Sequence, residues 1–230
     1  MKYSQLIRLG AIVALVGYIC SGPVGFLVTI LVHPQPSWRS ASLFASQYDI
    51  IQDIPYYFGL LLISGMLMLA AGHYRIARSV SDETSFHLLL SLMWSVVFAA
   101  LVSFNYLCQT TFIRHLALNY HSENDSLIAA FSLSNPMSLS WAIEMWGYGI
   151  LGVANLLLSG YYRQKNTLIR SLLIANGIIS IATVIVTIID IHWVMTTPGL
   201  IGYFLWNILM IWMMIAMIRY WNIKTTSPAV

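Results

Sequence analysis

Charged side chains are scarce in this sequence. Lys, Arg, Asp and Glu make up 8% of the 230 residues, against roughly 25% in soluble domains. The formal net charge is only +3, and the chain has no basic run and no interleaved aromatic platform, which excludes nucleic acid as a partner. Because 59% of the residues are hydrophobic, a soluble fold could not bury them all. We therefore expect the lipid bilayer to be the solvent for most of the surface.

Cysteine is also rare. Cys20 and Cys108 form no C-x-x-C motif and fall at different depths of different apolar segments, which argues against a disulfide or a thiol redox site. The chain contains neither H-E-x-x-H nor G-x-S-x-G, two signatures of catalytic sites. Any chemistry therefore has to come from other polar residues.

Six apolar segments run along the chain. Each is long enough, at about 1.5 Å per residue, to cross a hydrocarbon core of about 30 Å, the second only just. The first follows Lys2 and Arg8 but is longer than the apolar part of a signal peptide, so it is interpreted as a span. The spans are expected at residues 9–32, 55–71, 87–112, 139–162, 168–189 and 200–218. The predicted fold is an all-α, polytopic six-helix transmembrane bundle in one domain, residues 1–230.

The loops between these spans alternate in charge. One side carries only Arg39 and Arg114. The other side carries nine cationic residues: Lys2, Arg8, Arg75, Arg78, Arg163, Lys165, Arg170, Arg219 and Lys224. The positive-inside rule places the nine in the cytoplasm together with both termini, and an even number of spans also requires the termini to share a side. We expect a multi-pass protein of the plasma (inner) membrane.

Small residues line one face of the first span. Gly10, Gly17, Ser21 and Gly25 have the spacing at which two helices approach closely. They predict a packing seam, either inside the bundle or toward a partner helix or a second copy of the chain. Gly22-Pro23 is expected to kink this helix, because proline removes a backbone donor.

The two longer outer loops each contain a short helical pattern. Apolar residues at helical spacing in the first predict a segment lying at the membrane interface. In the second, Ser122 and Asp125 resemble a capping box, and Asn135-Pro136 ends the pattern. These segments would lie over the outer leaflet, where they could act as a lid. Long outer loops without any such role are equally common.

Two neighbouring spans carry polar stripes at steps of three and four residues, and each stripe has a carboxylate at its outer end. The first stripe is Glu144, Tyr148, Gly152, Asn155 and Ser159; the second is Asn176, Ser180, Thr183, Thr187 and Asp190. In antiparallel helices, Asn155 and Asn176 should meet in the inner half. Such polar residues commonly act as structural links between helices.

Glu144 and Asp190 are the leading candidates for a functional site. A charge at the bilayer centre costs roughly 2.5 to 3.5 kcal/mol, so intramembrane carboxylates are usually paired or functional. Both lie near the outer boundary, and the competing interpretation is an interfacial carboxylate that meets water or caps a loop. Asn105, Gln109 and Tyr148 would orient a ligand.

Arg114 and the nearby aromatic residues complete this picture. As one of the two outer cations, Arg114 is expected to pair with Glu144 or Asp190. Tyr106, Trp146, Tyr148 and Trp193 fall at the same level, where an aromatic belt at the headgroups is also expected.

A metal site or a haem is disfavoured. Metal ligation would draw on His115 and His192 beside the carboxylates, but Asp190 and His192 are about 200° apart around a helix. For haem, His73 with His87 or His115 with His192 lie at or beyond span ends rather than inside the spans. No cofactor is expected.

Three functions remain open. The first is binding, and transport, of a small polar, cationic or amphipathic ligand in a pocket open to the outer face or leaflet, with proton coupling through Glu144. The second is an enzyme acting on a lipid or isoprenoid headgroup, with Glu144 and Asp190 as acid and base. The third is a scaffold subunit whose stripes bind a partner helix.

Overall fold

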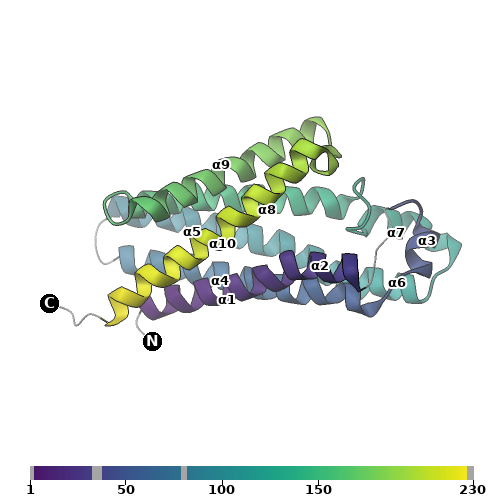
Figure 1. The fold of residues 1–230 in the computed structure, drawn as a ribbon, viewed down its shortest axis with the longest axis horizontal. Helices are drawn as coiled ribbons and strands as arrows, with labels where there is room; N and C mark the ends of the chain where they lie inside the picture. The colour runs from purple at the N-terminus through teal and green to yellow at the C-terminus, as the bar shows by residue number, and fades with distance from the viewer. Residues whose placement is uncertain (1–2, 33–37, 79–81, 227–230) are drawn as a thin grey trace.

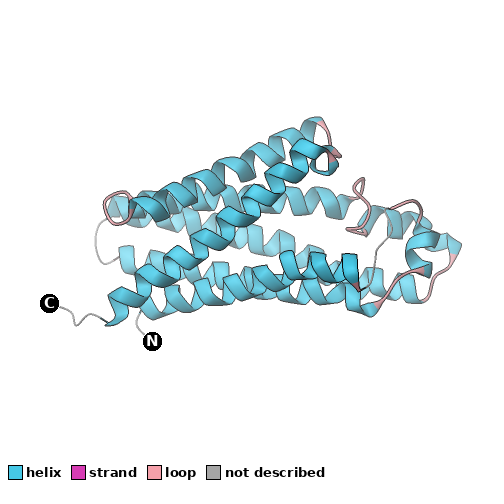
Figure 2. Ribbon diagram, viewed as in Figure 1, coloured by secondary structure: helices cyan, strands magenta, loops and turns pink. Residues whose placement is uncertain are grey.

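The computed structural model describes residues 3–32, 38–78 and 82–226, and every regular element in these ranges is a helix (Figures 1 and 2). Six helices are long and apolar enough to cross a membrane, as predicted. The candidate spans are Tyr3–Gly25, Ile50–Ala77, Ser85–Leu118, Leu139–Tyr162, Thr167–Ile189 and Thr197–Ile223. The protein is an integral, multi-pass membrane protein.

The described helices are α1 (Tyr3–Ser21), α2 (Pro23–Leu31), α3 (Ala41–Ser46), α4 (Ile54–Ala77), α5 (Asp82–Leu107), α6 (Arg114–Leu118), α7 (Asp125–Phe131), α8 (Leu139–Ser159), α9 (Thr167–Ile189) and α10 (Thr197–Thr226). The fourth and fifth spans match their predicted bounds closely. The second and sixth extend further than predicted toward the end of the bundle where α1 begins. Both extensions contain charged residues, such as Arg75 and Arg219, and a prediction from hydropathy alone leaves such residues outside a span.

The first span is interrupted where Gly22-Pro23 predicted a kink. Gly22 leaves helical geometry at φ −92° and ψ −94°, and α2 restarts at Pro23. Proline suits a first helical position because its missing N–H would be unpaired there anyway. The break ends α1 beside the site described below.

The small-residue face of α1 packs against α4 of the same chain. A Cβ on Gly10 would lie 2.8 Å from the carbonyl oxygen of Gly65, and one on Gly17 would lie 2.7 Å from that of Phe58. Gly25 faces the ring of Pro55 in the same way. The seam is thus filled within the bundle, which removes the support for a partner helix at Gly10, Gly17 and Gly25. Ser21 lines a cavity instead.

The polar stripes of α8 and α9 face each other, as expected for antiparallel neighbours. Asn155 Nδ2 donates to Asn176 Oδ1 at 2.7 Å, and both side chains are buried. A Cβ on Gly152 would lie 2.9 Å from the carbonyl oxygen of Gly177, so the helix backbones approach closely. Thr183 and Thr187 donate back to carbonyls of their own helix. The Asn155–Asn176 hydrogen bond and the close approach at Gly152 show that the inner part of the two stripes packs the helices together.

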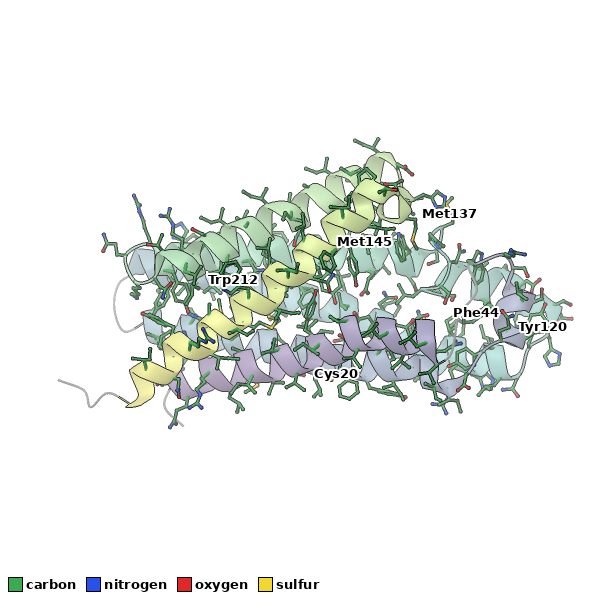
Figure 3. All side chains as sticks on the ribbon, viewed as in Figure 1. Cys20, Phe44, Tyr120, Met137, Met145 and Trp212 are labelled. Carbon is green, nitrogen blue, oxygen red and sulfur yellow. The ribbon has the colours of Figure 1, made fainter. Side chains whose placement is uncertain are left out.

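One end of the bundle, which we call the cap end, carries α3, α6 and α7 (Figure 1). Both predicted loop helices exist there, and they pack on α6 through Ala41, Leu116 and Ile128. Figure 3 shows Phe44 and Tyr120, which border this small cluster, at the same end. The cap thus has an apolar core of its own.

At the opposite end, α1 begins and α10 finishes (Figure 1). The helix ends that carry Arg8, Arg75 and Arg163 lie there too, as the charge pattern predicted. Lys2 falls outside the described residues. That this end faces the cytoplasm stays a prediction of the positive-inside rule.

A chain of hydrogen bonds joins three helical segments near this end. His73 is buried, and its Nδ1 donates to the Leu69 carbonyl at 2.8 Å, so its Nε2 accepts the Tyr162 hydroxyl at 2.6 Å. Tyr162 in turn accepts from Trp221 Nε1 at 2.8 Å. His73 therefore lies among hydrogen-bonded rings of the core.

Candidate functional site

Glu144 lies on α8 with its carboxylate turned toward α5. Asn105 Nδ2 donates to Oε2 at 2.8 Å, and the Tyr106 hydroxyl donates to Oε1 at 2.7 Å. The other proton of the Asn105 amide goes to the Ser140 carbonyl at 3.1 Å, which ties the same side chain to the start of α8. Each oxygen of Glu144 thus has a donor from α5.

The direction of these hydrogen bonds is set by the donors available. Because Tyr106 gives its proton to Glu144, the Tyr148 hydroxyl, 3.1 Å away, donates to the oxygen of Tyr106. All three side chains thus direct protons toward the carboxylate. An ionised carboxylate is an acceptor only and can take both donors from α5 at once.

Glu144 lines a cavity of about 390 Å³ in the half of the bundle nearer the cap end. Its walls include side chains from six helices: α1, α4, α5, α8, α9 and α10. The lining residues are Tyr18, Ser21, Gly22, Pro55, Tyr56, Tyr106, Leu133, Trp141, Glu144, Met145, Tyr148, Ser180, Thr183, Trp193, Val194, Met195, Gly199, Leu200, Tyr203 and Trp206. Glu144 is the only ionisable residue in this set apart from the tyrosines.

Aromatic rings dominate this lining. Trp206 has its ring centroid 5.2 Å from that of Tyr148, 5.8 Å from that of Tyr18 and 6.4 Å from that of Tyr203. The first two pairs are edge-to-face and the third is stacked, so the rings present both faces and edges to the cavity. Such rings attract cations through their negative π-faces.

Two hydrogen bonds join the helices around Trp206. The Tyr18 hydroxyl donates to Asn207 Oδ1 at 2.7 Å, which links α1 to α10. Trp206 Nε1 donates to Ser180 Oγ at 2.8 Å, which links α10 to α9. Figure 1 shows that α10 crosses the bundle obliquely from the end of α9 to the start of α1.

Gln109 takes a different position from the one expected. It belongs to a π-helical segment, Cys108–Ile113, that carries α5 into α6. Its Nε2 donates to the Phe131 carbonyl at 2.8 Å, and its Oε1 accepts from the Leu133 backbone N–H at 3.0 Å. Gln109 therefore holds the chain after α7, which places Leu133 in the cavity wall.

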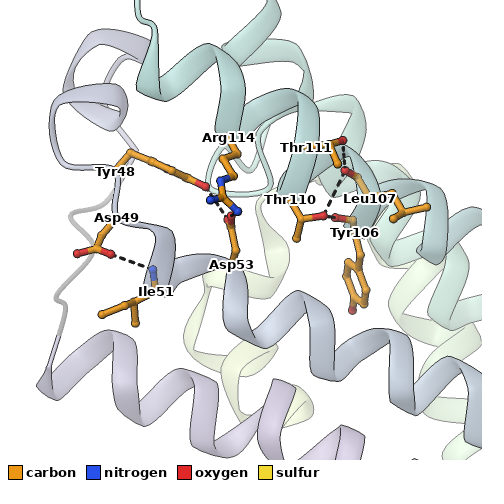
Figure 4. Close-up of polar contacts among 9 residues, drawn as sticks. All are labelled: Tyr48, Asp49, Ile51, Asp53, Tyr106, Leu107, Thr110, Thr111 and Arg114. Atoms are coloured by element: carbon orange, nitrogen blue, oxygen red, sulfur yellow. Dashed lines mark hydrogen bonds and ion pairs between the residues drawn. The ribbon is translucent and has the colours of Figure 1, made fainter.

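Two threonines inside the π-helical segment, Thr110 and Thr111, donate hydrogen bonds back to carbonyls of the preceding turn. Thr110 Oγ1 donates to the Tyr106 carbonyl at 2.9 Å, and Thr111 bonds to the Leu107 carbonyl (Figure 4). Such back-bonding threonines compete with regular helix geometry. The segment turns Gln109 toward α7 directly after Tyr106 faces the cavity.

Asp190 is not in the cavity wall. It ends α9 as an exposed residue, and its carboxylate accepts from the backbone N–H of His192 at 2.9 Å. The structure therefore supports the loop-capping interpretation of Asp190. The enzyme hypothesis needs Glu144 and Asp190 to act as a pair. The structure does not place Asp190 in the cavity beside Glu144.

Arg114 also differs from expectation, because its ion-pair partner is Asp53 rather than Glu144 or Asp190. Its Nη1 lies 3.8 Å from Oδ2 of Asp53, whose side chain is 2% exposed (Figure 4). Tyr48 donates to the other oxygen of Asp53 at 2.7 Å. Burial and this hydrogen bond raise the pKa of Tyr48, which stays a donor. Arg114 thus joins the cap to α4 and does not reach the cavity.

The two histidines considered for a metal site, His115 and His192, are exposed and belong to different elements. His115 lies on α6, and His192 precedes the turn Trp193–Met195. Among the described residues, no group of three or more His, Cys, Asp or Glu side chains is placed to hold a metal ion. His192 does not line the cavity, although the next residue, Trp193, does.

Sequence reasoning found Glu144, Asn105 and Tyr148, and the structure brings these three together. It treated Tyr106 and Trp193 as belt residues and did not consider Tyr18, Tyr56, Tyr203 or Trp206 for the site. One signal was available: aromatic residues recur near the outer ends of five spans. Trp146, by contrast, is exposed on the bundle surface, where a belt residue belongs.

No protein-family model, curated protein or solved structure matches this chain.

Proposed function

We propose that the protein binds a small organic cation in the cavity at Glu144. The observation that carries this proposal is a carboxylate in a membrane-embedded aromatic cavity with no Lys or Arg among the described side chains at ion-pair distance. A charge in such a place needs compensation. Asn105 and Tyr106 supply hydrogen bonds, and a bound cation would supply the opposite charge.

The lining favours an organic cation over a metal ion. Metal ions require several oxygen, nitrogen or sulfur ligands, whereas this cavity offers one carboxylate among Tyr and Trp rings. A cation over the face of Trp or Tyr gains roughly 0.5 to 2 kcal/mol per contact, most where water is excluded. The cavity volume of about 390 Å³ suits a ligand of drug size or smaller.

The contacts around the cavity favour a pocket that opens on one side over a channel through the bundle. Trp206 and Tyr18 are tied to α9 and α10 beside the cavity, and the stripes beyond are closed by the Asn155–Asn176 contact. Transport of the cation would require α10 to move relative to α1. Proton exchange at Glu144 would then be the natural coupling step.

The test compares two isosteric probes, phenyltrimethylammonium and uncharged tert-butylbenzene, by calorimetry on the protein in nanodiscs. The charged probe should bind the wild type and Asp190→Asn equally, and Glu144→Gln should weaken it by about tenfold or more, since 1.4 kcal/mol corresponds to tenfold. Equal binding of both probes, or no effect of Glu144→Gln, would contradict the proposal.

A folding defect in Glu144→Gln is separated from a binding defect by the neutral probe. Glutamine keeps the shape of glutamate and can still accept from Tyr106, so the aromatic cavity should persist. Tert-butylbenzene should then bind Glu144→Gln as it binds the wild type. Loss of both probes together would indicate a collapsed cavity, and Glu144→Asp, which keeps the charge, would then be measured in its place.

A further inference from the structure

Bound to the proposed site, a primary ammonium and a fully alkylated one would meet different surroundings. A primary ammonium brings three N–H donors that need acceptors. In the cavity, each Glu144 oxygen already accepts one hydrogen bond and has one further lone pair, so the carboxylate alone could take at most two of the three donors; Ser180 Oγ already accepts from Trp206. An alkylated ammonium carries no such requirement and prefers aromatic faces, which the cavity supplies from several directions.

The rings are placed to surround such a group. Tyr56 and Tyr106 lie 5.5 Å apart with their planes inclined by 41°, and Tyr148 meets Trp206 at 80°. The rings of each pair contact each other, each ring has a second face that its partner does not cover, and all four residues line the cavity. Aromatic rings arranged in this way around a carboxylate form the kind of cage that recognises methylated ammonium groups.

One wall of the cavity opens on the surface of the bundle. Met195, Leu200 and Tyr203 line the cavity and are also 53%, 52% and 47% exposed. Leu200 and Tyr203 belong to the sixth span, whose outward face is expected to meet lipid, and Phe204 beside them is exposed as well. A hydrocarbon chain would suit this opening better than water.

Glycines shape the two sides of this opening. Gly199 lets the turn Trp193–Met195 pack directly on the start of α10, because a Cβ there would clash with the backbone of Trp193 and Val194. Across the cavity, Gly22 at the break between α1 and α2 presents no side chain, and a Cβ there would approach Asn207 Oδ1. Gly199 therefore allows the backbones of the turn and of α10 to approach closely at the edge of the cavity.

We propose that the ligand is a membrane amphiphile with a fully alkylated ammonium group. Its head lies among Tyr56, Tyr106, Tyr148 and Trp206 against Glu144, and its hydrocarbon chain leaves the cavity past Met195, Leu200 and Tyr203 into the bilayer. This inference rests on the proposed function and adds the substitution of the ammonium and the origin of the ligand in the membrane.

The first experiment compares dodecyltrimethylammonium with dodecylammonium, which have the same chain and charge. Binding to the protein in nanodiscs is measured by calorimetry, and binding to Glu144→Gln is subtracted as partition into lipid. The trimethyl compound should bind at least about tenfold more tightly. Equal or tighter binding of the primary amine would overturn the inference about the head group.

The second experiment tests the exit of the chain with a substitution at the mouth. Leu200→Trp should weaken dodecyltrimethylammonium severalfold more than it weakens the short probe phenyltrimethylammonium, because only the dodecyl chain passes this residue. Phe204→Trp is the matched control, because Phe204 is exposed on the same helix but does not line the cavity. Both residues are half-exposed or more, so both variants should fold.

The outcomes separate this inference from the proposed function. If phenyltrimethylammonium binds through Glu144 but the dodecyl chain adds no affinity, or if Leu200→Trp and Phe204→Trp behave alike, the membrane origin is wrong and the cation site stands. If no cation depends on Glu144, both proposals fail together.

Discussion

The hydroxyl of Tyr106 donates a 2.7 Å hydrogen bond to Oε1 of Glu144, which joins α5 to α8 at the cavity. The ring of Tyr106 occupies space that only a glycine leaves on α4, because a Cβ on Gly59 would overlap its ring carbons. Three helices therefore set the position of one proton donor. The site depends on packing as much as on the polar residues themselves.

Tyr106→Phe should weaken the binding of phenyltrimethylammonium and lower the free energy of unfolding by about 1 to 3 kcal/mol, because a buried carboxylate loses a donor. The measurements are calorimetry and chemical unfolding in mixed micelles. Tyr56→Phe is the control, since Tyr56 lines the same cavity without a hydrogen bond to Glu144. Equal effects of the two variants would contradict a special role for the Tyr106 hydroxyl.

Asn155→Ala should lower the free energy of unfolding by only about 0.6 kcal/mol, the average for a hydrogen bond between transmembrane helices. It should leave cation affinity unchanged, because the Asn155–Asn176 contact is absent from the cavity lining. Asn105→Ala is the comparison variant, because it removes a hydrogen bond that Glu144 accepts and should reduce the affinity for the cation. A loss of affinity in Asn155→Ala would mean that the inner stripe belongs to the ligand path.

Gly17→Ala should destabilise the bundle by about 1 to 3 kcal/mol, because the new Cβ would press on the backbone of α4 and overpack the seam. Gly160→Ala is its control, since a Cβ at Gly160 meets nothing within 4 Å. The thermal midpoints of both variants in detergent check this prediction. A similar midpoint for the two variants would show that α1 and α4 do not pack as closely as described.

Arg114→Met and Asp53→Asn should each destabilise the cap, and their effects should not add. The two side chains form an ion pair at 3.8 Å with Asp53 buried, so the double variant should recover about 0.5 to 3 kcal/mol relative to the sum. Chemical unfolding of the four proteins gives this coupling free energy. Strict additivity would refute the pair, and cation binding should stay unchanged in Arg114→Met.

Much of the fold followed from the sequence because lipid imposes strong and local constraints. Apolar length predicted the six spans, and Gly22-Pro23 predicted the break in the first, since a missing backbone donor acts on its own helix. The four-residue spacing of small residues predicted a seam, although its partner was left open. Helical periodicity also predicted that Asn155 and Asn176 would meet.

The composition of the site followed from the sequence only in part. Placing a carboxylate in the membrane costs free energy, so Glu144 could be selected from the sequence. Asn105 and Tyr148 were predicted at the same depth in the membrane. Gln109 could not be placed, because the π-helical segment rotates it toward the chain after α7. Arg114 could not be paired, because the fold of the first outer loop brings Asp53 to it.

The sequence by itself determined that this protein lies in the membrane and singled out Glu144 as the candidate carboxylate, because hydropathy and the cost of a buried charge depend on residue type and depth. Tertiary structure alone decided which residues surround Glu144. Side-chain directions on six separate helices converge only after the helices pack, and the oblique path of α10 brings Tyr203 and Trp206 to the same cavity as Tyr106. For that reason the aromatic residues of a membrane belt and those that line a cavity look alike in the sequence and differ in the fold.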